Sequence, residues 1–573
     1  MRVYEAIVKA LEGIGVDAAF GGAGENAAPL MLALKHSTKI RSVITRHEQA
    51  ASFMACGYAI YSGRLGVCFA TAGPGAFNLF SGMAVAMSDS YPVLAISGFA
   101  SLAWKGKGAL NETSGVSRTP DSQVMFAATT KRSYLLQNPA ATCDVVEEAV
   151  NLAFDGRPGP VHIHVPESLA HPEITVDNYR DIKLDIRPVL PDPAKIADAA
   201  SLLARAIGEK RKILALIGFG AIRSRAGEEL RTFLEKFQIP FATTLDGKGI
   251  ISENHPLALG VFCDSGHDSA RKAFQRAEVV LSIGNSFAQH ATFNFHDRLF
   301  ENKTLIHINI DENEINKVYT ADCGIASDAR LAVTALTGEL SHAVSEVAPA
   351  RIEKEPFLDA TLKINQPNHI NPGQLALSLS KMLPENAIVL ADAGAHLAWL
   401  GFYLKLTRGQ NFHKPGSFGP MAWATNGGLG TKIAHPDRTI VVGCGDGCYN
   451  LSGFELMTAV QYNIPVIWII FNDGEFKLIK VFQLSAFYET GLIEFTNPDF
   501  VMYAKACGAQ GYRVESLKDF ERAFGEALRS NRPTIIDAVI TRLAIPHYSP
   551  SPAGLVAGIK DMIARRLGNQ KTM

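Results

Sequence analysis

The sequence predicts an α/β protein made of three doubly wound domains, each built on a parallel sheet. Short apolar segments rich in Val, Ile and Leu recur along the 573 residues, amphipathic segments separate them, and glycine follows several of them. The chain is also too long for a single hydrophobic core. We therefore expect ligands at the carboxyl ends of the strands, where sheets of this kind bind them.

The apolar segments fall into three groups, which place the predicted domains at residues 1–170, 190–345 and 369–545, followed by a C-terminal tail at 546–573 with a last helix. The first group predicts strands at 18–20, 40–44, 67–70, 93–97 and 161–165. The second predicts strands at 213–217, 241–243, 279–283 and 305–310. The third predicts strands at 387–390, 439–442, 466–471 and 534–539.

Composition argues against several classes of function. The chain is 47% hydrophobic and 19% charged with a net charge of −1, which describes a globular protein without the basic field that nucleic acid requires. Its eight cysteines form no C-x-x-C pair, so we expect reduced thiols in a cytoplasmic protein. Cys444 and Cys448 have no second Cys/His pair near them in sequence, so zinc is not expected.

No membrane segment is expected. The N-terminal residues 3–12 form an amphipathic pattern that carries Glu5 and Lys9, which a signal peptide would lack. The uncharged stretch 66–88 is long enough to span a bilayer. Gly73, Pro74 and Gly75 interrupt it, and we expect a strand, a turn and a helix there instead.

Two acidic residues follow neighbouring strands of the third domain. Asp446 lies in a Gly-Asp-Gly sequence after one predicted strand, and Asp473 follows the next strand, 27 residues later. Either motif alone is usually a simple turn. In a strand–helix–strand unit, however, both carboxylates reach the same sheet edge, where they suit Mg²⁺ or Ca²⁺. The amides of the helix after Asp446 would add affinity for phosphate.

This block resembles the signature of thiamine-diphosphate enzymes, in which Gly-Asp-Gly is followed about 27 residues later by Asn-Asn. Here Asp473 stands in place of the second Asn. The order of the three domains is similar to that of acetolactate synthases, benzaldehyde lyase and pyruvate decarboxylases over essentially the whole chain. The resemblance implies thiamine diphosphate, bound through Mg²⁺ (or Ca²⁺) by Asp446, Asp473 and the backbone carbonyl of Glu475.

The resemblance also implies the residues that activate the cofactor. Glu48 matches the glutamate that holds a proton at the pyrimidine N1′, although alone a Glu in a first helical turn usually complements the helix dipole. Met421 matches the aliphatic residue that bends the cofactor, although a buried Met is core filler by default. His396 is the expected phosphate donor. The other expected cofactor contacts are Gly75, Asn78, Gly419, Gly445, Gly447, Cys448 and Phe476.

Four positions are expected near the reacting atoms. Glu25 and Asn26 match the loop that carries an acid in pyruvate decarboxylases and a histidine in benzaldehyde lyase, and Glu25 could relay a proton unless it is a solvated loop acid. Arg118 falls where related enzymes carry glutamine, and a cation there suits an anionic substrate. Ile479 replaces the glutamate of pyruvate decarboxylases, which favours carboligation over simple decarboxylation.

The middle domain gives little support for a second cofactor. Acetolactate synthases that hold FAD carry an Arg-Phe-Asp-Asp-Arg element, which corresponds here to residues 286–290 without either arginine. This difference argues against FAD. The turn at residues 218–223 is a poor dinucleotide fingerprint, because Arg223 replaces its last glycine.

We therefore expect a thiamine-diphosphate enzyme that makes or breaks a C–C bond next to a carbonyl. The favoured activity is an FAD-independent, acetolactate-synthase-like carboligation of a 2-oxo acid such as pyruvate with a second carbonyl compound. A lyase of 2-hydroxy ketones or 2-hydroxyacyl thioesters and a 2-oxo acid decarboxylase remain alternatives. A different class would be an NAD(P)-dependent dehydrogenase. A non-catalytic thiamine-binding scaffold is disfavoured, because it would have no need of Glu48.

The resemblance further implies that each active site lies between two subunits of a homodimer or homotetramer, because Glu48 and the metal ligands belong to different domains. No nucleic acid or membrane partner is expected.

Overall fold

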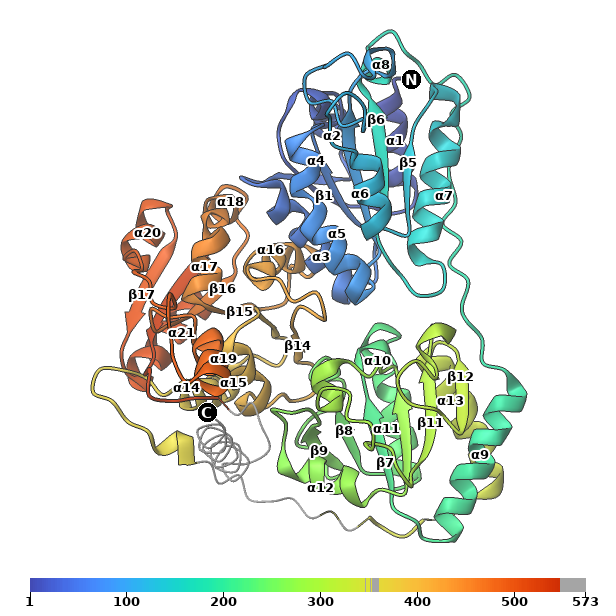
Figure 1. Cartoon of the computed structure of the whole chain (residues 1–573), viewed down its shortest axis with the longest axis vertical. Helices are drawn as coiled ribbons and strands as arrows, with labels where there is room; N and C mark the ends of the chain where they lie inside the picture. Colours follow the sequence, from blue (N-terminus) through green and yellow to red (C-terminus); the bar gives the residue numbers. More distant parts are fainter. Residues whose placement is uncertain (346, 351, 353–359, 547–573) are drawn as a thin grey trace, which may run out of the picture.

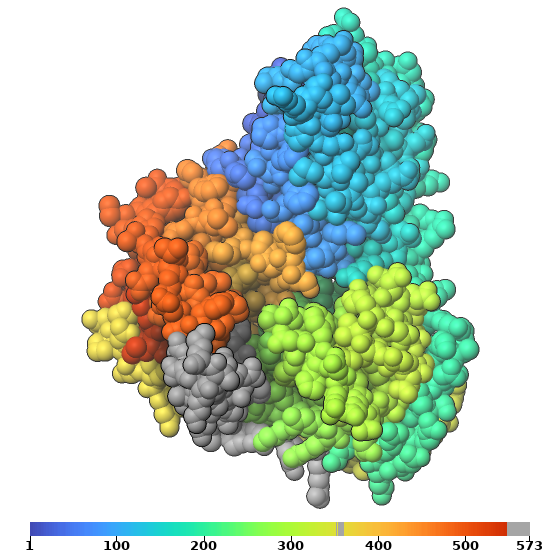
Figure 2. Space-filling view, in the orientation of Figure 1, coloured from blue at the N-terminus to red at the C-terminus, as the bar shows by residue number. Residues whose placement is uncertain are grey.

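The computed structural model describes residues 1–546 apart from 346, 351 and 353–359; the predicted tail after residue 546, with its last helix, lies outside the described residues. It contains three six-stranded sheets, each entirely parallel, with helices on both faces (Figure 1). The prediction of three doubly wound α/β domains is confirmed. In Figure 2 the N-terminal domain (blue to cyan) rises above the other two as a separate lobe.

The N-terminal domain has the strand order β2-β1-β3-β4-β6-β5. Its strands are β1 (Ala18–Gly21), β2 (Arg41–Ile44), β3 (Gly66–Ala70), β4 (Val93–Phe99), β5 (Arg132–Leu135) and β6 (Val161–Pro166). Its helices are α1 (Val3–Gly13), α2 (Ala28–His36), α3 (Glu48–Ser62), α4 (Pro74–Asn78), α5 (Phe80–Asp89), α6 (Ser122–Thr129), α7 (Thr142–Phe154) and α8 (Glu167–Ala170), with short 3₁₀ turns η1 (Glu25–Ala27), η2 (Leu102–Trp104) and η3 (Pro139–Ala141).

The middle domain has the order β12-β11-β10-β7-β8-β9, which is the arrangement of dinucleotide-binding folds. Its strands are β7 (Ile213–Ile217), β8 (Phe241–Thr243), β9 (Ala258–Val261), β10 (Val279–Ile283), β11 (Thr304–Asn309) and β12 (Cys323–Ala326). Its helices are α9 (Pro193–Gly208), α10 (Phe219–Arg223), α11 (Gly227–Lys236), α12 (Asp268–Arg276) and α13 (Ala329–Ala343), with 3₁₀ turns η4 (Gln289–Thr292) and η5 (Glu312–Glu314).

The C-terminal domain repeats the order of the first, as β14-β13-β15-β16-β18-β17. Its strands are β13 (Ile388–Ala391), β14 (Asn411–His413), β15 (Ile440–Gly445), β16 (Ile467–Asn472), β17 (Gln510–Val514) and β18 (Thr534–Val539). Its helices are α14 (Pro372–Met382), α15 (Ala395–Tyr403), α16 (Trp423–Ala434), α17 (Asp446–Ser452), α18 (Leu456–Gln461), α19 (Lys477–Phe487), α20 (Phe500–Ala506) and α21 (Leu517–Ser530), with 3₁₀ turns η6 (Ala360–Lys363) and η7 (Gly453–Glu455).

Five strands were not predicted, and all five lie at the edge of a sheet: β5, β9, β12, β14 and β17. An edge strand is covered on fewer sides than a central one, so its sequence carries less apolar signal. The strand β5, for example, reads Arg-Ser-Tyr-Leu and buries only Tyr134. The central strands, which are buried along almost their whole length, are the ones that hydrophobic runs identify.

Helices α3 and α16 join the N-terminal and C-terminal domains at almost backbone contact. A side chain at Gly57 would collide with the carbonyl oxygen of Gly427, and one at Gly430 would collide with that of Met54. The Thr431 hydroxyl donates a hydrogen bond to the Gly57 carbonyl across the contact, at 2.9 Å. Because Gly57 meets Gly427 while Met54 meets Gly430, the two helices run antiparallel.

Within the part of the chain that the structure describes, no helix is long and apolar enough to cross a membrane.

The glycine contact predicts a large effect of one added methyl group. We expect Gly57→Ala to force α3 and α16 apart at a cost of about 2 kcal/mol, which lowers the thermal unfolding midpoint by about 4–8 °C for domains of this size. Gly338→Ala is the control, because Gly338 lies in the helix α13 with open space around it. That variant should be neutral or slightly stabilised. Equal midpoints for the two variants would contradict the tight contact.

Candidate cofactor site

The strand order of the C-terminal sheet reverses between β13 and β15, and the loops after these two strands carry polar side chains. The chain goes from β13 to β14, which lies beside β13 on one edge, and then to β15, which lies beside β13 on its other edge. A crevice at the carboxyl ends of two such strands is the usual ligand site of an open α/β sheet. Here His396 follows β13 and Asp446 follows β15.

Hydrogen bonds to Asp446 tie together the loops after β15 and β16. Its carboxylate is buried and accepts the backbone N–H of Gly474 at 2.7 Å and the side-chain amide of Asn497 at 2.8 Å. Gly474 is the neighbour of Asp473, so the two predicted acidic residues lie in adjoining loops. The Asn497 amide also donates to the side-chain oxygen of Asn472, at 2.9 Å. Asn497 was not predicted from the sequence, because a lone Asn in a loop carries no motif.

Two lysines, the buried Lys477 and the partly exposed Lys480, pair with the acidic residues. The Glu475 side chain pairs with Lys477 and, at 2.7 Å, with Lys480, while its backbone carbonyl accepts the Lys477 N–H at 2.9 Å. The Lys477 ammonium also lies 3.4 Å from the carboxylate of Asp473. The carbonyl oxygen of Glu475 retains a second lone pair. Lys477 was not predicted from the sequence, because a lone Lys near a helix start carries no motif.

Glycines form a cradle around an unpaired histidine. The His396 side chain is buried and its Nε2 atom has no hydrogen-bond partner among the described residues. A side chain at Gly445 would come within 3.1 Å of the His396 ring, and one at Gly447 within 2.8 Å of the Phe476 ring and 3.5 Å of the Met421 methyl group. Small residues therefore keep the space between these three side chains open.

Asp392 fixes the segment that contains Met421. Its carboxylate accepts the backbone N–H of Ala424 at 2.7 Å and both the N–H and the hydroxyl of Thr425, so it caps the start of α16. The residue before α16, Ala422, has a positive φ of 64°. This sharp turn follows Met421 directly, and Gly419 precedes it with φ of 59°. Cys448 is held nearby, with its thiol donating to the Ala393 carbonyl at 3.1 Å.

The N-terminal sheet has the same switch in strand order, because β2 and β3 lie on opposite sides of β1. Glu48 is the first residue of α3, and its carboxylate accepts the Asn78 amide at 2.9 Å. A side chain at Gly22 would come within 2.8 Å of the Glu48 carboxylate, and one at Gly75 within 3.1 Å. Asn78 and Gly75, both predicted as cofactor contacts, are thus neighbours of Glu48.

Glu25 and Asn26, predicted together, differ in burial. Glu25 is exposed on η1, whereas Asn26 is buried and its side-chain oxygen is within 3.4 Å of the Thr71 hydroxyl. A side chain at Gly98 would collide with Asn26. Asn26 therefore supports the fold of its own domain, and Glu25 is the residue of the pair that is available to a ligand.

Arg118 lies on an irregular loop between η2 and α6. It is exposed, and its φ of 68° is unusual for a residue with a side chain. The buried carboxylate of Glu112 organises this loop by accepting the backbone N–H groups of Gly108 at 3.0 Å and Ala109 at 3.1 Å. The pKa of Glu112 is lowered below its usual range, mainly by the hydrogen bond from the Ser114 hydroxyl and also by those from the backbone N–H groups. Ile479 is half-exposed on α19.

Within one chain, Glu48 and Met421 lie at opposite ends of the α3–α16 pair. Glu48 precedes the Gly57 contact by nine residues, and Trp423, the first residue of α16, precedes Gly427 by four. Because the helices are antiparallel and rise about 1.5 Å per residue, the two ends are about 20 Å apart. The predicted diphosphate residues and Glu48 therefore form two separate groups in the chain.

Comparison with known proteins accounts for all three domains. Residues 1–118 match the N-terminal TPP binding domain of the thiamine pyrophosphate enzymes, residues 199–336 match their central domain, and residues 392–538 match their C-terminal TPP binding domain. A probable acetolactate synthase large subunit of Methanococcus aeolicus is 33% identical, over 94% of this chain and 92% of that protein. The chain belongs to the thiamine pyrophosphate enzymes.

Other relatives cover similar lengths. The acetolactate synthase large subunit of Corynebacterium glutamicum is 33% identical over 94% of this chain and 87% of that protein. The isozyme 2 large subunit of acetolactate synthase from Escherichia coli is 29% identical over 95% of this chain and 96% of that protein. The resemblance inferred from the sequence motifs is thereby confirmed.

The residues of this thiamine pyrophosphate enzyme suit an anionic ligand with a cation. The Nε2 atom of His396 has no partner among the described residues, and burial lowers the pKa of His396 to about 4 against a hydrogen bond to the backbone of Asp392. A bound phosphate would favour the protonated ring, whose Nε2–H can donate to a phosphate oxygen. Burial raises the pKa of Asp446. The pKa of Asp473 is raised to about 7, mainly by burial; Lys477 lowers it, and the nearby carboxylates of Asp446 and Glu475 raise it further. A bound divalent cation would relieve this repulsion.

Side-chain ligands alone do not define a metal centre. Among the described residues, no group of three or more His, Cys, Asp or Glu side chains could hold a metal ion. The predicted set needs only two carboxylates, since its third protein ligand is a backbone carbonyl and the remaining ligands would be phosphate oxygens or water. The donors of Asp446, Asp473 and the Glu475 carbonyl therefore fit Mg²⁺ with a diphosphate, not an all-protein metal cage.

A cleft of about 1940 Å³ lies where the three domains meet and extends to Gly394 and Gly419, in the loops before α15 and α16. The turn at Gly218 and Gly220 lines it, but packing explains both glycines, because a side chain at either would meet the backbone of Gly284. His290, which occupies the position of one missing FAD-binding arginine, pairs with Asp264 at 2.6 Å.

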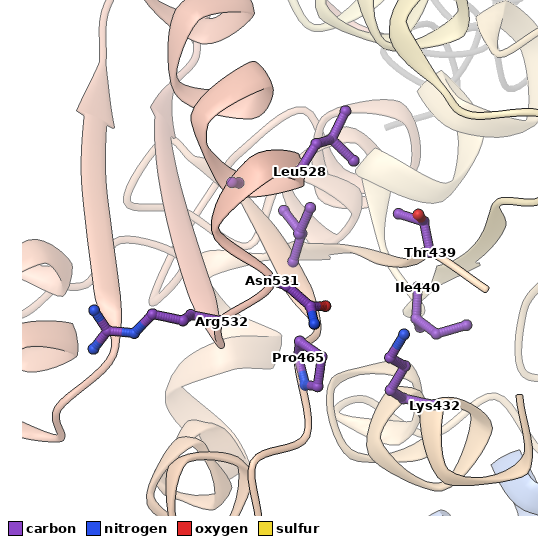
Figure 3. A pocket seen from close by; sticks show the side chains of 9 residues that line it. Lys432, Thr439, Ile440, Pro465, Leu528, Asn531 and Arg532 are labelled. Atoms are coloured by element: carbon purple, nitrogen blue, oxygen red, sulfur yellow. The ribbon is translucent and has the colours of Figure 1, made fainter. Parts of the chain in front are cut away.

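A separate cavity of about 40 Å³ lies at the amino ends of β15 and β16, at the opposite end of these strands from Asp446. Lys432, Pro465 and Asn531 line it (Figure 3). It is too small for a cofactor.

The raised pKa of Asp473 predicts a pH-dependent cost in the apoprotein. The pKa of Asp473 is about 7 in the folded protein and 3.8 ordinarily. The folded apoprotein therefore loses stability as the pH rises from about 4 to about 7, because the unfolded chain gives up this proton first. We expect Asp473→Asn to stabilise the apoprotein at pH 8 by a few kcal/mol, at about 1.4 kcal/mol per pKa unit, but to have little effect near pH 4. The same change should weaken Mg²⁺ binding, measured by calorimetry.

The control is Asp297→Asn, because Asp297 is exposed to solvent in the middle domain. Thermal unfolding at both pH values should not distinguish this variant from wild type. Unchanged stability of Asp473→Asn apoprotein at pH 8 would mean that Asp473 is not a strained carboxylate.

Proposed function

We propose that this enzyme is an FAD-independent, Mg²⁺-dependent carboligase that removes CO₂ from a 2-oxo acid and joins the remaining acyl group to a second carbonyl compound. The observation that carries the proposal is the pairing of two groups in one chain. One is the acidic cluster of the C-terminal domain together with His396, whose Nε2 has no partner, and the other is Glu48 with Gly22 and Gly75 close to its carboxylate. The similarity to acetolactate synthase large subunits supports the choice of reaction.

The proposed cofactor residues have distinct tasks. Asp446, Asp473 and the carbonyl of Glu475 would bind Mg²⁺, and the His396 Nε2 would donate to the diphosphate. Gly445 and Gly447 leave room for the phosphates, since a side chain at either would fill the cradle. In addition, Met421, held by the turn before α16, would pack against the cofactor, with Gly419, Cys448 and Phe476 around it.

When bound, thiamine diphosphate supplies a carbon nucleophile that attacks a carbonyl group. Glu48 would hold the proton at the pyrimidine N1′, and Asn78 fixes the Glu48 carboxylate for that task through the bond at 2.9 Å. The neighbouring backbones at Gly22 and Gly75 exclude water from one side of the carboxylate.

A complete site would require two copies of the chain. Glu48 and Met421 are about 20 Å apart along the α3–α16 pair, too far for one thiamine to reach both in a single chain. A second copy, related by two-fold symmetry, would bring Glu48 of one chain to the diphosphate loops of the other. We propose a homodimer, or a homotetramer built from two such dimers.

Three exposed residues would determine the substrate. Arg118 would bind the carboxylate of the 2-oxo acid, which suits a guanidinium on a loop held by Glu112. Glu25 would exchange a proton with the substrate, and the apolar Ile479 would keep proton donors away from it until the second carbonyl compound arrives. The absence of arginine at Ser286 and His290, and the glycine packing at Gly218, support a reaction without FAD.

A product screen tests the proposed reaction. Holoenzyme assembled with thiamine diphosphate and Mg²⁺ should convert pyruvate, alone or with aldehydes, into 2-hydroxy ketone products that mass spectrometry detects. Glu48→Gln should bind the cofactor with similar affinity but lose about 100-fold or more in turnover, because it cannot share the proton. Free aldehyde as the main product would instead indicate a decarboxylase, and cleavage of added 2-hydroxy ketones would indicate a lyase.

The role of Arg118 has its own test. Arg118→Ala should raise KM for an anionic donor by about tenfold or more, the value of one charge-assisted contact, with a much smaller effect on a neutral aldehyde. Equal effects on both substrates, measured by initial rates, would remove Arg118 from the substrate site.

A further inference from the structure

Glu455 is a buried carboxylate of the C-terminal domain whose hydrogen bonds cross to the N-terminal domain. It ends η7, directly after α17, and only 1% of it is exposed. One carboxylate oxygen accepts the backbone N–H of Arg46 at 2.8 Å and that of His47 at 3.0 Å. The other oxygen accepts the hydroxyl of Thr458. Burial raises the pKa of Glu455, although these three donors oppose the shift.

The two N–H groups that Glu455 binds belong to the residues directly before Glu48. His47 is the N-cap of α3 and Glu48 is its first residue, so the backbone here sets the direction of the Glu48 side chain. The N–H groups of residues before a helix have no partner within it. Glu455 therefore supplies, from another domain, acceptors that α3 cannot provide for itself.

The surrounding contacts hold the same segment against the same part of the C-terminal domain. The Tyr462 hydroxyl accepts the N–H of Ile44 at 3.0 Å, and the Arg46 guanidinium donates to the side chain of Gln461 at 2.6 Å. The His47 ring lies edge-on to Phe454, with centroids 6.5 Å apart. Among these partners only Glu455 bonds to two successive backbone groups next to Glu48.

We propose that Glu455 is a positioning residue, which orients Glu48 by fixing the backbone at Arg46 and His47. Asn78 holds the Glu48 carboxylate at its tip and Glu455 holds its helix at the base, so the acid is fixed at both ends. The inference rests on the proposed function of Glu48. It adds that α17, which begins with the metal ligand Asp446, also leads to the residue that places the proton-sharing acid of its own chain.

The direct test measures exchange of the C2 proton of thiamine diphosphate for deuterium in the assembled holoenzyme, by acid quench and proton NMR. Glu455→Ala should slow this exchange about 10- to 100-fold, because a misplacement of about 1 Å has such an effect, while cofactor affinity changes little. Glu455→Gln should keep the rate within about threefold, since its remaining oxygen can accept both N–H groups and Thr458 can reverse its hydroxyl. Should Glu455→Ala not fold, Glu455→Asp, with its retracted carboxylate, should show an intermediate loss.

Glu253→Ala is the matched control. Glu253 is also a carboxylate between domains, accepting Lys248 at 2.6 Å and the N–H of Leu406 at 2.8 Å, but it contacts neither cofactor group. This variant should lose thermal stability and keep the wild-type exchange rate. If Glu455→Ala exchanges as fast as Glu253→Ala, the positioning role is wrong.

The wild-type and Glu48→Gln enzymes separate this outcome from failure of the proposed function. If Glu48→Gln slows exchange but Glu455→Ala does not, only the role of Glu455 is overturned. If wild-type holoenzyme exchanges no faster than free thiamine diphosphate, both proposals fail.

Discussion

Helices α3 and α16 meet backbone to backbone, because Gly57 and Gly430 place no side chain between them. This contact fixes the N-terminal domain against the C-terminal domain, and it also determines what one chain can do alone. Each helix follows a loop of the candidate site, with Glu48 at the start of α3 and Met421 just before α16. The antiparallel crossing sends these two ends apart. The helix pairing thus keeps the two groups of candidate site residues apart within one chain.

The same architecture explains why buried charge is concentrated in a few loops. The carboxylates of Asp446 and Asp473, the paired Glu475 and Lys477, and the unpaired His396 all lie where strands of the C-terminal sheet end. Burial disfavours their charged forms and raises the pKa of both aspartates. Such an arrangement is costly for stability alone and reasonable where a cation and an anion are bound.

Much of this arrangement follows from the sequence. The central strands, the 27-residue spacing from Asp446 to Asp473, and the position of Glu48 at a helix start are local patterns, so they could be read directly. The edge strands were missed because half-covered strands such as β5 carry little apolar signal. Contacts such as those of Asn497 and Glu455 join segments far apart in the chain, and no local pattern predicts which polar residue will meet which loop. The buried state of Asn26 likewise depends on Thr71 and Gly98, which tertiary packing brings to it.

The central claim is that one cofactor site takes Glu48 from one copy of the chain and Asp446 from another. Co-expression of Glu48→Ala and Asp446→Asn chains with different tags, followed by purification of the hybrid that carries both, tests it directly by turnover. In a shared-site dimer, one of the two sites of the hybrid contains neither substitution, so activity should return to about half that of wild type, although each homodimer is inactive. A hybrid as inactive as its parents would contradict the account, because it would place Glu48 and Asp446 in the same site of a single chain.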